Sequence, residues 1–380
     1  MSILATFGVF AIGFLVRPLG AILFGYIGDH AGRKKALILS MFMMSFPTFL
    51  IGLLPDYFKI GIWAPVLLIA LRIVQGLAVS GELTTATVFL IEHAETRHRG
   101  LAGSLAMAGA LLGMVLSAMF ATVMTKTMGH TELATWGWRV PFLIGGMIGG
   151  LGLIVRWHTI EPPEYEQMRS QKQKLSVKQH IASLSARVLI LGIFITSIMA
   201  IANYFLIGFF NTFLTESQKL PLDSVMLINT FAISIQVIMT VAMGHISDKI
   251  GKKTVLRAGI TSLVVLVYPI FWLLTQHNIY LAFLGETIFA LAAGSLTGVV
   301  PTLLTELFDT HHRNMGISIT YNIALALFGG TAPLVGISLV NYTNNAYSPA
   351  WYVISGGILA LWALQTKYPS HKREKGAKHK

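Results

Sequence analysis

The sequence predicts an all-α membrane protein built from two similar bundles of helices. Three observations carry this prediction: long apolar segments, an uneven distribution of basic residues, and a ten-residue turn that occurs twice. Of the 380 residues, 54% are hydrophobic and only 12% are charged, whereas soluble domains usually carry about a quarter charged residues. Such a chain has too few charged residues to cover a surface that faces water on all sides.

The apolar residues form eleven segments long enough to cross a hydrocarbon layer about 30 Å thick. We expect membrane helices at 3–28, 37–55, 63–91, 101–125, 139–157, 187–214, 224–247, 254–275, 279–306, 314–341 and 349–367. A longer polar stretch separates the fifth span from the sixth. The predicted domains are an N-terminal bundle at 1–157, a linker at 158–186, a C-terminal bundle at 187–367 and a basic tail at 368–380.

The basic residues predict the orientation of these spans. Of the 28 lysines and arginines, 22 fall on one side of the predicted membrane, four fall on the other side, and Arg17 and Arg72 lie within spans. The positive-inside rule assigns the side with 22 to the cytoplasm. We therefore expect a multi-pass protein of the inner (plasma) membrane with a cytoplasmic C-terminus. The net charge of +12 then reflects orientation, and we expect no nucleic-acid partner.

Several kinds of chemistry find no support in the sequence. The chain has no cysteine, which excludes disulfides, thiolate zinc sites and thiol nucleophiles. His311–His312 and Glu92–His93 lack further ligands nearby, so we expect no metal. No nucleophile–base pair is recognisable. The sequence therefore predicts neither an enzyme nor a cofactor.

A repeat relates the two predicted bundles. Residues 25–34 (GYIGDHAGRK) recur as residues 244–253 (GHISDKIGKK), at an offset of 219. A weaker repeat follows, because Glu92 precedes Arg99 by seven residues and Glu306 precedes Arg313 by seven. Two similar offsets in the same order indicate homologous halves in the same orientation, related by an axis along the membrane normal.

The duplicated turn resembles the signature loop of the major facilitator superfamily. Other segments resemble its metabolite:proton symporter branch, in particular its proline/betaine members: Arg17–Gly20, Gly61–Pro65, Arg72–Gly76, Gly137–Phe142 and Glu161–Tyr165. The resemblance implies the major facilitator fold, with twelve spans. Counted inward from the signature turn, the span not found here is the first. The family pattern around Glu82 also differs, because this chain reads Ser-Gly-Glu-Leu-Thr-Thr at 80–85.

The resemblance also implies a gating role for the turns. In the superfamily the signature aspartate contacts a positive helix N-terminus on the opposite half, and the contact breaks when the cytoplasmic gate opens. This implies gating by Asp29 and by its counterpart Asp248. The accompanying gate residues are Gly32, Arg33, Lys34, Gly251 and Lys252. The alternative is that the turns serve only as topology anchors.

Charged residues within the spans are the candidate transport residues. Arg17 and Arg72 lie deep in the membrane, where an unpaired guanidinium is costly, and a guanidinium binds a carboxylate bidentately. Helical rotation places Gln75 and Glu82 on the face of Arg72. We expect Arg17, Arg72 and Gln75 to bind substrate and Glu82 to carry a proton, or else Arg72 and Glu82 to form a structural ion pair. Glu286, near the middle of the ninth span, is a weaker second candidate for proton coupling.

The sixth span is rich in aromatic residues. Tyr204 lies beside several phenylalanines, and Tyr204 and Asn211 share a helix face. An aromatic cage would bind a quaternary ammonium such as betaine, although such residues more often pack or face lipid.

Together these features predict a proton-coupled symporter that imports a small carboxylate-bearing solute by alternating access. The expected partners are the solute, the proton and the lipid membrane. Candidate solutes are osmolyte zwitterions such as proline or betaine, and di- or tricarboxylates. The alternative, favoured by the absent first span, is a truncated, transport-inactive remnant or a membrane sensor.

Overall fold

The computed structural model describes residues 16–169 and 177–366, and α-helices, with short 3-10 and π segments, are the regular structure of this part. The N-terminal half contains α2 (Arg17–His30), α3 (Arg33–Leu53), α4 (Tyr57–Ile60), α5 (Trp63–His93), η1 (Thr96–His98), α6 (Arg99–Thr127), α7 (His130–Glu132), η2 (Leu133–Gly137) and α8 (Arg139–Trp157). The linker holds α9 (Pro163–Arg169) and α10 (Val177–Ser183).

The C-terminal half continues the same pattern. It contains α11 (Ala186–Tyr204), η3 (Phe205–Phe209), α12 (Phe210–Thr212), η4 (Phe213–Ser217), α13 (Leu222–Ile250), α14 (Lys252–Leu274), α15 (Ile279–Leu307), α16 (Arg313–Ala324), η5 (Leu325–Gly329), α17 (Ala332–Thr343) and α18 (Pro349–Gln365). The elements η2 to η5 are π-helical segments within or next to longer helices.

The predicted multi-pass helical fold is confirmed. In the described residues, nine helices are long and apolar enough to cross a membrane. Two further predicted spans correspond to α2, which is described from Arg17, and to α18, which has 17 residues. Residues 1–15, where the first predicted span begins, and the predicted tail at 368–380 lie outside the described part.

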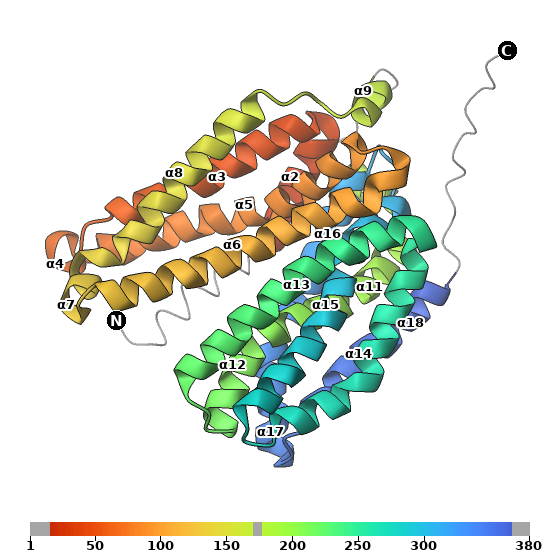
Figure 1. Ribbon diagram of the computed structural model, residues 1–380. Helices are drawn as coiled ribbons and strands as arrows, with labels where there is room; N and C mark the ends of the chain where they lie inside the picture. Colours follow the sequence, from red (N-terminus) through yellow and green to blue (C-terminus); the bar gives the residue numbers. More distant parts are fainter. Residues whose placement is uncertain (1–15, 170–176, 367–380) are drawn as a thin grey trace.

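The two halves form a V. Figure 1 shows them converging at the end of the molecule where α9 lies and separating toward α4 and α7 on one half and α17 on the other. We call the converging end the linker end and the opposite end the far end. The helices α2 and α6 of the first half meet α16 and α13 of the second half at this interface.

The repeated turn is explained by backbone conformation. Gly32 follows α2 with φ +118°, and Gly251 follows α13 with φ +95°. A residue with a Cβ rarely adopts such angles. Each glycine therefore reverses the chain at the linker end and starts the next helix directly, α3 in one half and α14 in the other.

Burial differs strongly between individual helices. In the most apolar 18-residue stretch, 83% of the residues of α15 are buried, whereas only 6% are buried in Leu133–Trp157, which contains α8. Small residues bring α8 close to α3, because Gly146 lies against Phe49 and Gly149 lies against Ser45. The large buried apolar cluster lies mainly in the C-terminal half.

Candidate functional site

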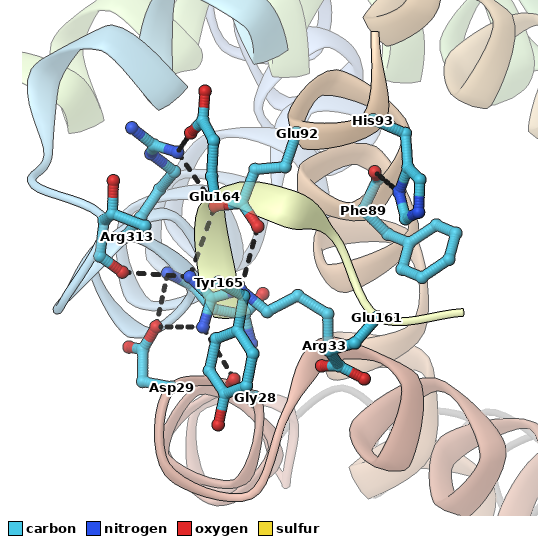
Figure 2. A network of polar contacts seen from close by, with 12 residues as sticks. Gly28, Asp29, Arg33, Phe89, Glu92, His93, Glu161, Glu164, Tyr165 and Arg313 are labelled. Carbon is cyan, nitrogen blue, oxygen red and sulfur yellow. Dashed lines mark hydrogen bonds and ion pairs between the residues drawn. The ribbon is translucent and has the colours of Figure 1, made fainter. Parts of the chain in front are cut away.

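A buried charge network joins the two halves at the linker end (Figure 2). Arg33, the first residue of α3, is fully buried. Its Nη1 donates to Asp29 Oδ1 at 2.9 Å and to the Gly28 carbonyl at 2.6 Å. Its Nε donates to Glu92 Oε2 at 3.1 Å, and its Nη2 donates to the Thr310 carbonyl of the other half at 2.9 Å. All of these partners are acceptors, so the guanidinium is buried with compensating charge.

The linker helix α9 extends this network. Arg313 Nη1 donates to Glu92 Oε1 at 2.8 Å and to Glu164 Oε2 at 2.7 Å, and Glu164 also pairs with Arg99. Burial alone would raise the pKa of the Glu164 carboxyl, but the charges of Arg313 and Arg99 outweigh burial and hold this pKa below its usual range. Glu164 therefore connects an arginine of each half.

The two signature aspartates make the same contact in opposite directions. Asp29 accepts the backbone N–H groups of Asn314 and Met315, at 3.1 and 2.9 Å, at the start of α16. Asp248 accepts those of Gly100 and Leu101, at 2.7 and 2.9 Å, at the start of α6. A carboxylate stabilises a helix N-terminus because the free N–H groups there carry partial positive charge. Each half thus caps a helix of the other half.

The remaining residues of the turns have different partners in the two halves. The Lys34 backbone N–H donates to both oxygens of Glu161, at 3.2 and 3.1 Å. In the second half, Lys252 Nζ pairs with Glu306 Oε1 at 2.9 Å. This pair corresponds to Arg33 and Glu92, but the Glu306 side chain is 42% exposed whereas that of Glu92 is fully buried. The ion pair of the first turn is therefore more deeply buried than the corresponding pair of the second turn.

Arg72 and Gln75 lie together within the N-terminal half. Arg72 Nη1 donates to Gln75 Oε1 at 3.2 Å, and Gln75 Nε2 donates to Thr48 Oγ1 of α3 at 2.6 Å. The Arg72 guanidinium also lies 5.7 Å from the centroid of the Phe142 ring of α8. Both residues therefore contact neighbouring helices of their own half.

Glu82 has a separate set of partners. It forms an ion pair with Arg156 of α8, and Ser40 Oγ of α3 donates to its Oε2 at 2.6 Å. The sequence predicted a shared face for Arg72, Gln75 and Glu82, and all three contact α3 or α8, but Glu82 is not paired with Arg72. The sequence did not predict that Arg156 pairs with Glu82. Arg156 lies at the end of a predicted span, so we expected its side chain in the turn that follows.

Glu286 is the most deeply buried acid of the C-terminal half. Its side chain is fully buried, Asn229 Nδ2 donates to its Oε2 at 3.1 Å, and its Oε1 has no hydrogen-bond partner among the described residues. Glu286 is the eighth residue of α15, about 10 Å along the helix from its far end. The expectation that it lies near the middle of this span is therefore wrong.

Arg17 begins the described part of α2, about 18 Å of helix rise from Asp29. The Arg17 guanidinium and the Tyr204 hydroxyl both lie close enough to the Tyr321 hydroxyl to interact with it electrostatically. Tyr321 belongs to α16 and Tyr204 to α11. Arg17 of the first half is therefore near enough to Tyr321 of the second half to interact with it electrostatically, and Tyr321 was not identified from the sequence.

A polar cluster beside Tyr204 was also missed. Gln236 Nε2 of α13 donates to Asn203 Oδ1 of α11 and to Thr297 Oγ1 of α15, the latter at 3.3 Å. Thr297 Oγ1 donates to Asn203 Oδ1 at 3.1 Å. Gln236 is fully buried. The three residues come from three helices, and no local pattern in the sequence connects them.

The phenylalanines of the sixth span pack together rather than form an open cage. Phe205, Phe209, Phe210 and Phe213 are fully buried, and Phe210 contacts the Phe289 ring edge-on at a centroid distance of 4.8 Å. In the described part of the chain, no group of three or more His, Asp or Glu side chains is placed to hold a metal ion.

Comparison with known proteins places these features in a family. A sequence model of the Major Facilitator Superfamily matches residues 2–321 and 193–380. The glycine betaine/proline/ectoine/pipecolic acid transporter OusA of Dickeya dadantii is 32% identical over 389 residues, which cover 99% of this chain and 77% of that protein. The proline/betaine transporter of Escherichia coli is 32% identical over 390 residues, with the same coverage of 99% and 77%.

Solved structures show the same fold. The proton:xylose symporter XylE bound to 6-bromo-6-deoxy-D-glucose matches with a TM-score of 0.73 and 17% identity, over 94% of this chain and 84% of that chain. The human organic anion transporter MFSD10 matches with a TM-score of 0.69 and 15% identity, over 95% of this chain and 84% of that chain.

Proposed function

This chain belongs to the major facilitator superfamily, and from this premise we propose that it imports a small zwitterionic solute of the proline/betaine type together with a proton. The superfamily and the named relatives make it a membrane transporter. The substrate, the proton and the sidedness are our proposal. We take the linker end as cytoplasmic because most basic residues flank it.

One observation carries the choice of solute: Arg17 of the first half and Tyr204 of the second half both act electrostatically on Tyr321 of α16, a helix that packs against α2. A guanidinium suits a single carboxylate, and tyrosine rings suit a quaternary or secondary ammonium. Arg72 is engaged by Gln75 and Phe142. Of the two arginines proposed from the sequence to bind substrate, we therefore assign only Arg17 to the solute. One cationic group favours a zwitterion over a di- or tricarboxylate, which would need more positive charge.

Glu286 is the proposed proton carrier. An ionised carboxylate in an apolar interior is unfavourable unless a cation pairs with it. Asn229 is the hydrogen-bond donor to Glu286 among the described residues, and it is neutral. Glu82 already pairs with Arg156, so we assign Glu82 a structural role between α5 and α8.

Alternating access would use the contacts at the linker end. Asp29 and Asp248 cap helices of the opposite halves, and Arg313 pairs across the halves with Glu92. Breaking these polar contacts would open the linker end without disrupting the core of either half.

Uptake by the purified chain in proteoliposomes tests this function. We expect labelled proline or glycine betaine to accumulate, faster with an imposed inward proton gradient, and citrate to compete poorly. Uptake that ignores the gradient would contradict proton coupling. The absence of uptake of any of these solutes by a folded protein would favour the remnant or sensor.

A further inference from the structure

A cavity at the linker end lies outside the contacts between the two halves. Its volume is about 670 Å³, and it lies between the start of α3, the end of α8 and the linker segment that carries Glu161 and Tyr165. The helices α3 and α8 pack against each other at the outer side of the N-terminal half, as Figure 1 shows. The cavity therefore lies where these two predicted spans reach the membrane surface.

The cavity has a cationic end. Lys34 and Lys35, consecutive residues in the first turn of α3, both line it. Neither ammonium is paired with a carboxylate of the described residues. Two adjacent ammonium groups at a membrane surface attract an anion, and each basic residue near an anionic leaflet adds to the attraction.

The opposite wall of the cavity is apolar and lies on the outer surface of the helices. Leu39 and Phe42 continue along α3 from the lysines, and Leu153 and Trp157 face them from α8. The side chains of Phe42 and Trp157 are 49% and 69% exposed. Lys35 and Phe42 are two helical turns apart, about 10 Å. Tryptophan is enriched at the level of lipid headgroups, where its ring contacts both apolar and polar groups.

The inner wall of the cavity is held in place by hydrogen bonds. Glu161 accepts the Lys34 backbone N–H, so its carboxylate is directed to the helix start. Tyr165 is 1% exposed, and its hydroxyl donates to the His30 carbonyl at 3.0 Å. Figure 2 shows Tyr165 beside the Arg33 network, with the Arg33 guanidinium 4.9 Å from the centroid of its ring. The cavity is thus a formed site with a charged end, which Lys34, Lys35 and Glu161 line, and an apolar wall.

We propose that this cavity binds an anionic phospholipid, with the phosphate at Lys34 and Lys35 and an acyl chain along Leu39 and Phe42. A free phosphate would use only the lysine end, whereas phosphatidylcholine, which has no net charge, would bind the lysines more weakly because its own ammonium group is repelled by them. Phosphatidylglycerol uses both the lysine end and the apolar wall. The site does not depend on the transported solute.

Native mass spectrometry of the purified full chain tests the site with three probes: phosphatidylglycerol, phosphatidylcholine with the same acyl chains, and inorganic phosphate. We expect phosphatidylglycerol to bind at least 10-fold more tightly than phosphatidylcholine. The double variant K34Q/K35Q should lose about 10- to 30-fold in affinity for phosphatidylglycerol. The charge-matched control K249Q/R257Q removes two exposed cations from the other half and should bind like the wild type.

A second measurement keeps both lysines and follows tryptophan fluorescence. Phosphatidylglycerol with brominated acyl chains should quench tryptophan fluorescence, and Trp157→Phe should remove the saturable part of this quenching. Equal binding of the two lipids, equal losses in both double variants, or displacement of the lipid by inorganic phosphate at similar concentration would each overturn the proposal. Unchanged quenching in Trp157→Phe would also overturn it.

Discussion

Asp29 and Asp248 are reciprocal caps: each carboxylate accepts two backbone N–H groups at the start of a helix that belongs to the opposite half. The two caps are not equivalent, because Asp29 also accepts the buried Arg33 guanidinium. Loss of the Asp29 charge therefore leaves Arg33 with less compensation, whereas loss of the Asp248 charge affects the helix start alone.

We expect Asp29→Asn to weaken closure of the linker end more than Asp248→Asn. Each change should lower the uptake rate, with Asp29→Asn at about 10-fold or more, because a weakened buried charge contact costs about 1–3 kcal/mol. Spin labels on cysteines introduced at Glu95 and Lys249, both exposed at the linker end, would report the distance between the halves. The natural chain has no cysteine, so labelling would be specific. A longer distance in Asp248→Asn than in Asp29→Asn would contradict this ranking.

Glu286→Gln should uncouple uptake from the proton gradient. Glutamine keeps the shape and still accepts a hydrogen bond from Asn229, but it cannot exchange a proton. We expect exchange of solute across the membrane to continue while gradient-driven accumulation is lost. Glu82→Gln is the matched control, and it should retain gradient dependence while lowering the thermal stability, because Arg156 loses its partner. The reverse pattern would assign coupling to Glu82.

Arg17→Lys should raise the KM for glycine betaine by about 10-fold or more, because lysine cannot hold a carboxylate in the bidentate geometry of arginine. Arg72→Lys should change KM little, since Arg72 contacts Gln75 and Phe142 of its own half. Initial rates of labelled betaine uptake over a range of concentrations would measure both. Equal KM effects in the two variants would place Arg72 at the solute site as well.

The two linker glutamates should respond to pH in opposite directions. The pKa of Glu164 lies below its ordinary value of 4.5 because Arg313 and Arg99 outweigh the effect of burial. Its contribution to docking of α9 is therefore present above about pH 4.5 and is lost as the pH falls through the lowered pKa. Burial raises the pKa of Glu161, so the ionised form of Glu161 is the disfavoured one when α9 is docked. The free-energy cost of burying the ionised Glu161 carboxylate is absent at low pH, where Glu161 is protonated. It grows as the pH rises through the raised pKa.

Glu164→Gln should therefore loosen α9 at neutral pH, and Glu161→Gln should leave it docked. Hydrogen exchange of a peptide that covers Pro163–Arg169 would measure docking in both variants. Faster exchange in Glu161→Gln than in Glu164→Gln would contradict the assignment of the anchoring charge to Glu164.

Gly32→Ala should destabilise the protein more than Gly251→Ala. Both positions have positive φ, which costs an alanine about 1 kcal/mol or more. At Gly32 a Cβ would also lie 2.4 Å from Glu161 Oε1, whereas at Gly251 the nearest atom would be Thr254 Oγ1 at 3.8 Å. Thermal unfolding of the two variants in the same detergent would compare them. Equal shifts in Tm would mean that the linker moves aside freely.

Local features of the sequence were sufficient to predict where the helices lie. The predicted span 139–157 coincides with α8 (Arg139–Trp157), and the glycines of the repeat occupy the positive-φ turns. Apolar length and glycine turns are properties of neighbouring residues, so they are readable without the fold.

Pairings between distant helices were less predictable. Arg156 follows Glu82 by 74 residues, and Asn229 precedes Glu286 by 57, so no helical period relates either pair. Arg17 and Tyr204 act electrostatically on Tyr321 only in the folded chain, because the three residues are far apart in the sequence.

The unequal burial of α15 and α8 has a mechanical consequence. A helix with 83% of its central stretch buried is held by protein on every side, whereas one with 6% buried relies on lipid tails for most of its contacts. Bilayer thickness and lateral pressure therefore act mainly on α8 and its neighbours. We therefore expect a change in bilayer thickness to displace α8 before it displaces α15.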